Sequence, residues 1–300
     1  MIMFPIIRVT QPQDAPEPLG TKRKYWFKDD SGQEMLFKAE ERGYGEDWSE
    51  KIACELAALL GIPHVHYEMA RDVNSDQPGV VCAQIRQPGE ALVHGNTLLQ
   101  LIDPEYPKTK LRVPEHTVSA VYSVIRALKP PLPHWSANVP TGMTTGVEVF
   151  VGYLMLDAWV ANQDRHHENW AALWTGEQLT LAPSYDHGAC LARNVSDEEK
   201  KERLITKDAG YSVATFAGRA GSRLFNLATD TRPLSALEAF RQFSAPVAQA
   251  ADAWKDRLRA IDQSVMEGVL DRVPPDRLSR VCRDFTLRLL LENQKRILDA

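Results

Sequence analysis

The stretch that decides the fold is Ala161–Gly188, which reads ANQDRHHENWAALWTGEQLTLAPSYDHG. The apolar segment Val147–Ala161 predicts a helix that ends where this stretch begins. Two short apolar runs follow, separated by a polar turn, and they predict a β-hairpin with arms of nearly equal length. Because paired strands lie about 5 Å apart, the hairpin should bring Asn169 and Asp186 together at its base. Asp164 should reach the same point from the preceding loop.

These three side chains form an oxygen-rich set, two carboxylates and a carboxamide, which suits Mg²⁺. In protein kinases the catalytic loop places an Asp five positions before an Asn, and a metal-binding Asp-x-Gly triplet follows beyond a hairpin. Asp164 and Asn169 repeat that interval, and Asp186-His187-Gly188 stands at the place of the triplet. The pattern predicts that Asp164 is the catalytic base and that Asn169 and Asp186 bind Mg²⁺ on the phosphates of ATP.

The residues between these positions have simpler expected roles. Arg165 is expected to fix the loop through an ion pair. Adjacent histidines cannot both face one ion from a regular element. We therefore expect one of His166 and His167 to pack within the loop and the other to support Asp186. A metal-dependent hydrolase that uses both histidines is the least favoured alternative.

A phosphoryl-transfer site also needs a cation near the phosphates, held by an acidic partner. Lys38 closes the apolar run Met35–Phe37 and is predicted to be that cation, with a solvated strand end as the alternative. Glu50 lies early in the next expected helix, on one stripe with Cys54, and is predicted to pair with Lys38. A capping box with Asp47 as the N-cap is an equally open explanation of Glu50.

Two further segments are expected to contact the nucleotide. Gly20-Thr21-Lys22 precedes the first hairpin and is predicted to cover the phosphates, because glycine and exposed amides form anion-binding concavities. A basic surface turn is the alternative for these three residues. The strand Val81–Ile85 is expected to cross between two lobes, where Gln84 and Ile85 would contact the adenine.

The overall pattern predicts an α+β, two-lobed, protein-kinase-like fold. Residues 1–90 are expected to form a small strand-rich N-lobe with one main helix, and residues 91–300 a larger helical C-lobe, with a linker at Gln87–Gly95. The expected N-lobe elements are a hairpin of Lys22–Lys28 with Glu34–Lys38, a helix at Trp48–Leu60 stopped by Gly61, and strands at His64–Ala70 and Gly79–Ile85. The expected C-lobe helices are Val113–Leu128, Val147–Ala161, Pro233–Phe243, Pro246–Arg259 and Pro275–Ala300.

The composition excludes several classes of protein. The 300 residues carry 35 Lys+Arg against 40 Asp+Glu, a net charge of -5, which argues against direct nucleic-acid binding. The longest apolar stretch is too short to cross a bilayer, and the first residues lack the pattern of a secretory signal. Four scattered cysteines suit buried, reduced thiols better than disulfides or zinc. The sequence therefore predicts a cytoplasmic protein without a membrane partner.

Four segments resemble one family, the HipA-like serine/threonine kinases, which are bacterial relatives of protein and phosphatidylinositol kinases. Ala161–Trp170 and Leu181–Gly188 look like the central motifs of that family. Trp48–Ile62 resembles its N-lobe helix, and Val273–Leu298 resembles its C-terminal helices. The likeness spans roughly residues 20–298.

The resemblance implies an ATP- and Mg²⁺-dependent kinase that phosphorylates a Ser or Thr hydroxyl on a protein substrate. At the matching positions it implies that Lys38 contacts the ATP phosphates, that Glu50 pairs with Lys38, and that Asp164, Asn169 and Asp186 have the roles given above. For some members it also implies toxin activity and an antitoxin or other regulatory partner. A lipid or small-molecule kinase and a nucleotide-binding regulatory pseudokinase remain alternatives on the same fold.

Overall fold

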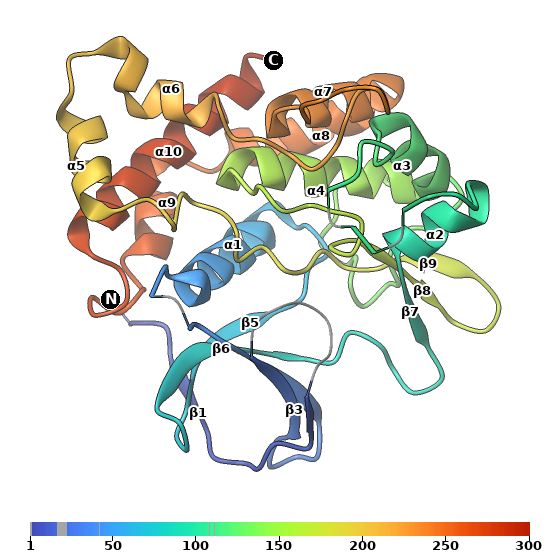
Figure 1. Ribbon diagram of the computed structural model, residues 1–300, viewed down its shortest axis with the longest axis horizontal. Helices are drawn as coiled ribbons and strands as arrows, with labels where there is room; N and C mark the ends of the chain where they lie inside the picture. Colours follow the sequence, from blue (N-terminus) through green and yellow to red (C-terminus); the bar gives the residue numbers. More distant parts are fainter. Residues whose placement is uncertain (1, 17–22, 42, 108, 111) are drawn as a thin grey trace.

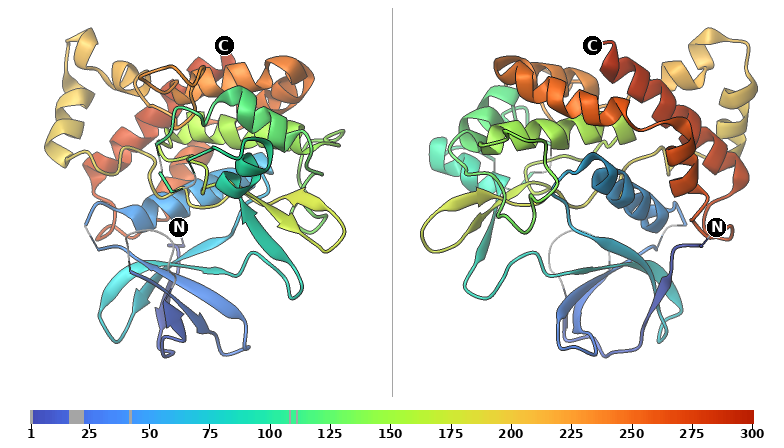
Figure 2. Two further views of the ribbon diagram at one scale, coloured as in Figure 1. Left: turned by 45° about the vertical axis from the view of Figure 1, so that its right-hand side comes forward. Right: turned by 180° about the vertical axis from the view of Figure 1, so that it is seen from behind.

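The computed structural model describes residues 2–16, 23–41, 43–107, 109–110 and 112–300. A twisted sheet built from the first part of the chain lies below a larger group of helices, and one helix, α1, lies between them (Figure 1). The two further views keep this arrangement (Figure 2). The two-lobed α+β architecture expected from the sequence is therefore present.

The first sheet has six strands in the order β1-β5-β6-β4-β3-β2. β1 runs parallel to β5, and the other pairs are antiparallel. The expected hairpin is present as β3 and β4, and its turn is fixed by Asp29, whose Oδ1 accepts hydrogen bonds from the backbone of Ser31 and Gln33. The strands are β1 Ile6–Val9, β2 Ala15–Pro16, β3 Lys24–Lys28, β4 Glu34–Ala39, β5 Tyr67–Asp72 and β6 Gln77–Ala83.

Two strands differ from the prediction at both ends: β5 spans Tyr67–Asp72 instead of His64–Ala70, and β6 spans Gln77–Ala83 instead of Gly79–Ile85. β5 begins at Tyr67 and not at His64, because the backbone at Pro63 and Val65 pairs instead with Ser184. β6 ends at Ala83, so Gln84 and Ile85 lie just beyond the strand.

Helix α1 spans Glu46–Leu60 and starts earlier than predicted. Its N-cap is Gly45, which has a left-handed backbone, so Asp47 is not the cap. The Asp47 carboxylate instead accepts a hydrogen bond of 3.0 Å from Nε of Arg277. The helix ends as expected at Gly61, where φ is 77° and a Cβ would lie 2.1 Å from the carbonyl oxygen of Asn138. α1 packs on β5 and β6 with one face and on α8 and α9 with another.

A second, three-stranded sheet follows, with β7 Ala91–His94, β8 Ala171–Trp174 and β9 Leu179–Leu181. β8 and β9 form the hairpin predicted from the decisive stretch. The linker predicted at Gln87–Gly95 is only partly correct. Its second half forms β7, which pairs with β8 and extends the hairpin (Figure 1).

Helix α4, Gly146–Val160, is the centre of the helical part, and all its residues except Glu148 are buried. Its N-terminus has a capping box in which Thr145 and Glu148 satisfy each other's backbone. α7, α8 and α10 pack around it. The other helices are α2 Gly95–Ile102, α3 Val118–Ile125, α5 Asp197–Ile205, α6 Val213–Ala217, α7 Ala236–Ser244, α8 Ala248–Arg259, α9 Gln263–Leu270 and α10 Arg280–Leu298, with 3₁₀ turns η1 Ala209–Tyr211 and η2 Ala245–Val247.

Four of the predicted helices, α3, α7, α8 and α10, start too early, and the caps explain the two largest differences, at α3 and α10. Thr117 caps α3, and Ser279 caps α10, each by accepting a hydrogen bond from a backbone N–H three residues later. Among the described residues, no helix has the length and apolar character that crossing a bilayer requires.

We predict that Gly152→Ala destabilises the protein although alanine is the better helix former. A Cβ at this position of α4 would lie 2.6 Å from the indole of Trp254. That ring is fully buried and donates a 2.8 Å hydrogen bond to the carbonyl of Glu148, so it cannot move aside cheaply. Overpacking should cost about 1–3 kcal/mol of unfolding free energy, measured by urea denaturation. Gly268→Ala in α9 is the matched control, because its Cβ meets nothing within 4 Å. It should stabilise by about 0.4–1 kcal/mol, and equal effects of the two variants would contradict the argument.

Candidate active site

Lys38, Glu50 and Asp186 meet between the first sheet and the helical part. Lys38 lies near the end of β4, Glu50 in the second turn of α1, and Asp186 beyond β9. The Lys38 Nζ lies 2.5 Å from Oδ1 of Asp186 and 3.3 Å from Oε2 of Glu50. The ammonium group also lies 5.2 Å from the ring centre of Tyr67, a cation–π contact. Three elements far apart in the sequence thus contribute one charge cluster.

The charges in this cluster support one another. Burial opposes the charged form of Lys38, but the carboxylates of Asp186 and Glu50 outweigh it and raise the pKa of Lys38 above its usual value. Burial likewise opposes ionisation of Glu50, yet the Lys38 ammonium and a hydrogen bond from His187 lower the pKa of Glu50. Both groups are therefore charged at neutral pH, as an ion pair requires.

Glu50 also holds the Asp186-His187-Gly188 segment against α1. Its Oε1 accepts a 2.6 Å hydrogen bond from the backbone N–H of His187, and its Oε2 accepts one of 3.1 Å from that of Gly188. The hydroxyl of Ser49 donates to the carbonyl of Gly188 at 2.9 Å. The capping-box explanation of Glu50 is therefore wrong: its carboxylate points across to this segment and not back to the N-terminus of its own helix.

The loop after α4 carries Asp164 and Asn169. The Asn169 side-chain N–H₂ donates a 2.6 Å hydrogen bond to the carbonyl of Asp164, which orients its amide oxygen as an acceptor. Arg165 is almost fully buried and makes the expected ion pair, with Nε and Nη2 each 2.7 Å from the carboxylate of Asp157. Its Nη1 donates to the carbonyl of Asn169 at 2.8 Å, so Arg165 links Asn169 of the loop to Asp157 of α4.

The two histidines of this loop have different surroundings. The His166 ring lines the same cavity as Asp164 and Asp186, and its Nδ1 accepts a hydrogen bond from the backbone of Glu168. His167 is buried, with Nδ1 2.8 Å from the hydroxyl of Tyr106, and burial lowers its pKa to about 4. The two rings lie at 90° to each other, so they do not present a shared face to one ion.

Two adjoining cavities meet at Lys38 and Asp186. The first is polar and includes both acidic groups of the charge cluster together with Asp164, Gly188 and Arg193. The second has apolar walls and is lined on one side by Asn169; its other lining residues include Trp26, Leu36, Gln84, Ile85, Leu92 and Tyr185. Gln84 and Ile85 both line this second cavity, and their contact with adenine stays a prediction. The predicted phosphate-covering residues Gly20, Thr21 and Lys22 lie outside the described residues.

The fold is similar to that of solved structures. A search of solved structures matches the Helicobacter pylori proinflammatory kinase CtkA with a TM-score of 0.74 and 18% identity, over 98% of this chain and 96% of that one. The chain has a protein-kinase-like fold. The toxin–antitoxin protein HipA of Shewanella oneidensis, solved with HipB and its operator DNA, matches with a TM-score of 0.60 and 11% identity, over 99% of this chain and 70% of that one.

No protein-family model and no curated protein sequence matches the chain. Within the kinase-like fold, the first sheet with α1 forms the N-lobe and the helices around α4 form most of the C-lobe. The kinase-like fold implied by the resemblance to HipA-like kinases is confirmed by these two structures.

Sequence reasoning missed three residues that contact the site. The Tyr67 hydroxyl accepts a 3.4 Å hydrogen bond from the backbone of Asp186, and His187 places Nδ1 3.5 Å from Glu50 while its Nε2 contacts Ser184 at 2.7 Å. Arg223 places Nη2 3.1 Å from Oδ1 of Asp164. His187 alone carried a usable signal, since it occupies the middle of the Asp-x-Gly triplet. Tyr67 and Arg223 belong to no motif and reach the site only through the tertiary fold.

Proposed function

We propose that this protein is an ATP- and Mg²⁺-dependent phosphotransferase that phosphorylates a Ser or Thr hydroxyl of a protein substrate. The observation that carries the proposal is the buried Lys38–Glu50 ion pair, which lies against Asp186 in one cavity with Asp164. A lysine at a solvated strand end would not be expected to lie buried beside two carboxylates from other parts of the chain. Phosphoryl transfer requires it, because a cation must be held rigidly beside the phosphates.

The residues present fit a bound magnesium–nucleotide. Asp186 and Asn169 line one cavity and supply a carboxylate and an amide oxygen, which are ligand types that Mg²⁺ accepts together with phosphate oxygens. Magnesium would neutralise the charge of the phosphates and orient them for displacement. Lys38 would contact the phosphates, and Glu50 would hold Lys38 in place. The apolar walls formed by Trp26, Leu36, Ile85 and Tyr185 suit a flat purine ring.

Asp164 is the group proposed to orient the acceptor hydroxyl and take its proton. It lies at the polar cavity and is about one third exposed, so an acceptor can approach it from solvent. Its backbone carbonyl is held by Asn169, which fixes its distance from the metal-binding side of the site. Substitution of Asp164 should therefore have the largest effect on catalysis.

The proposed acceptor and partners are inferred from similarity to other proteins, whereas the proposed reaction is inferred from the geometry of the site. The protein acceptor is proposed from the sequence resemblance to HipA-like serine/threonine kinases, and of the two structural matches one is described as a kinase and the other as part of a toxin–antitoxin system. A toxin role with an antitoxin or other regulatory partner is a further hypothesis, based on the likeness to HipA. We expect neither a membrane nor nucleic acid to be a direct partner, since the chain carries a net charge of -5.

The proposal is tested by incubating the protein with radiolabelled ATP and Mg²⁺ beside three acceptors: casein, lipid vesicles and a sugar mixture. We expect label on casein or on the protein itself. Asp186→Asn should lower the rate by about 10²–10³-fold, because one preorganised charge is removed from the site. Asp271→Asn is the matched control, since Asp271 is similarly exposed and also pairs with a cation.

Other outcomes decide between the alternatives. Label on lipid or sugar alone would keep the phosphotransferase and overturn the protein acceptor. ATP binding that depends on Lys38, with no turnover, would favour a regulatory pseudokinase. Absence of both binding and turnover would overturn the proposal altogether.

A further inference from the structure

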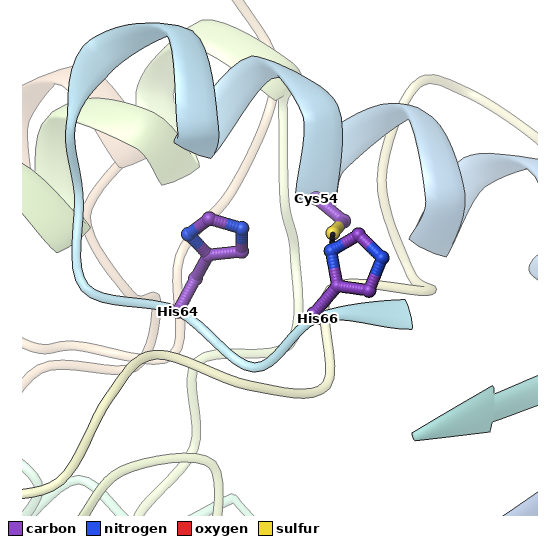
Figure 3. Close-up of side chains that lie close together, drawn as sticks. All are labelled: Cys54, His64 and His66. Atoms are coloured by element: carbon purple, nitrogen blue, oxygen red, sulfur yellow. Dashed lines mark hydrogen bonds between the residues drawn. The ribbon is translucent and has the colours of Figure 1, made fainter. Parts of the chain in front are cut away.

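A cysteine and two histidines converge outside the cavities described above. Cys54 lies in the third turn of α1, one turn beyond Glu50, and His64 and His66 lie in the connection between α1 and β5. One donor atom from each of the three side chains lies within 4.8 Å of the other two. Figure 3 shows a ring nitrogen of each histidine directed toward the cysteine sulfur. From this juxtaposition we propose a Zn²⁺ site with Cys54, His64 and His66 as protein ligands.

The distance between the Cys54 sulfur and the His66 ring suits zinc. A tetrahedral ion with Zn–S of about 2.3 Å and Zn–N of about 2.0–2.1 Å places sulfur and nitrogen ligands roughly 3.5–3.6 Å apart. The Cys54 Sγ and the His66 Nδ1 lie 3.7 Å apart. One thiolate with two imidazoles is a ligand set that Zn²⁺ accepts, with the fourth position left for water or another exogenous ligand.

The hydrogen bonds around the histidines select the tautomers that zinc needs. The Nδ1 of His64 lies 2.7 Å from the carbonyl of Ile62, which can only accept, so Nδ1 carries the proton and Nε2 keeps its lone pair. The Nε2 of His66 lies 2.7 Å from Oε1 of Glu68, so Nε2 carries the proton. Its Nδ1 then keeps the lone pair that faces Cys54. A carbonyl and a carboxylate are the usual partners of metal-bound histidines.

The surrounding structure holds these groups in place before any metal binds. Glu68 is fixed by Lys51, whose Nζ lies 2.9 Å from Oε2. The backbone N–H of Tyr67 donates a hydrogen bond to the Cys54 sulfur at 3.4 Å, and it would stabilise a thiolate that binds a metal ion. The connection that carries His64 is pinned on both sides of that residue, through Pro63 and Val65, to the backbone of Ser184.

An ion can enter from solvent. The Cys54 side chain is buried, but the His66 side chain is 61% exposed, so the site is closed on the helix side and open at His66. Binding would release the thiol proton of Cys54 to solvent and would add no other group to the protein. The bound ion would join α1, one turn from Glu50, to the start of β5.

The test uses the full chain after removal of metal with a chelator. Titration with Zn²⁺ alone should give one tight site per chain, and Co²⁺ as a spectroscopic probe should show a thiolate-to-cobalt charge-transfer band with intense tetrahedral d–d bands. His66→Gln should weaken Zn²⁺ binding by about 100-fold or more and remove the tetrahedral spectrum. Because the His66 side chain is exposed, the variant should keep its fold, and circular dichroism checks this directly. His134→Gln, at another exposed histidine, is the matched control.

Cys54→Ser is the second variant, and it should abolish the charge-transfer band even where some metal still binds. Cys282→Ser controls for the loss of a buried thiol. Oxygen ligands at Asp186 and Asn169 cannot give a thiolate band, so the result is independent of the proposed kinase site. A wild-type protein with no charge-transfer band, or with Zn²⁺ affinity that neither variant changes, would overturn the proposal.

Discussion

Asp164→Asn should abolish nearly all phosphoryl transfer while the protein keeps its fold and its nucleotide affinity. Asparagine has the same shape as aspartate but cannot accept a proton from the acceptor hydroxyl. General acid–base catalysis by one side chain is worth about 10²–10⁴-fold, so the turnover number should fall by that factor. The KM for ATP should change little, because the proposed phosphate and metal contacts come from Lys38, Asn169 and Asp186.

The structure also predicts the effect of this substitution on stability. Asp164 and its ion-pair partner Arg223 are each 35% exposed, so the pair contributes at most about 1 kcal/mol, and the melting temperature should hardly move. Asp256→Asn is the control, since it removes a carboxylate from another exposed ion pair, with Arg259 on α8. Initial rates, nucleotide titration and thermal unfolding of both variants complete the measurement. If Asp164→Asn kept more than about a tenth of wild-type turnover, Asp164 would not be the base.

The convergence of Asp164, Asn169 and Asp186 was predictable because these residues belong to short motifs with fixed spacing. Asp164, Asn169 and Asp186 come together because the predicted hairpin of β8 and β9 joins them. The sequence leaves two explanations of Glu50, an ion pair with Lys38 and a capping box with Asp47, and the position of Gly45 decides between them. Gly45 adopts φ of 76° and starts the helix two residues before Asp47, so Glu50 falls too far along α1 for a capping box.

The features that sequence reasoning missed depend on contacts between distant segments. Pro88 and Gly89, which precede β7, favour a linker in the sequence. The β7 backbone nevertheless pairs with the edge of β8, a contact between segments far apart in the chain. Arg223 lies far from Asp164 in sequence and reaches it only through the folding of the C-lobe. The Cys54–His64–His66 cluster has no C-x-x-C spacing in the sequence, because the two histidines come near Cys54 only through the turn of the chain after α1.

Arg165→Met should destabilise the protein by about 3–5 kcal/mol, the largest effect on stability that we expect, because it strands a buried charge. The side chains of Arg165 and Asp157 are 2% and 5% exposed, and two hydrogen bonds of 2.7 Å join them. Without the guanidinium, the Asp157 carboxylate keeps the 2.8 Å hydrogen bond from Asn162 but loses its counter-ion. Urea unfolding followed by circular dichroism measures the loss, and Arg288→Met, at an exposed ion pair, should cost about 0–1 kcal/mol.

A double variant distinguishes the cost of leaving the Asp157 carboxylate unpaired from the cost of the packing lost with Arg165. Asp157→Asn in the Arg165→Met background removes the unpaired charge and keeps an oxygen for Asn162. It should be more stable than the single Arg165→Met variant by about 0.5–3 kcal/mol, the range of coupling between residues in contact. Activity should not recover with stability, because the double variant still lacks the Arg165 Nη1 hydrogen bond to the carbonyl of Asn169. A single variant that costs less than about 1 kcal/mol would mean that Arg165 is not what holds this loop to α4.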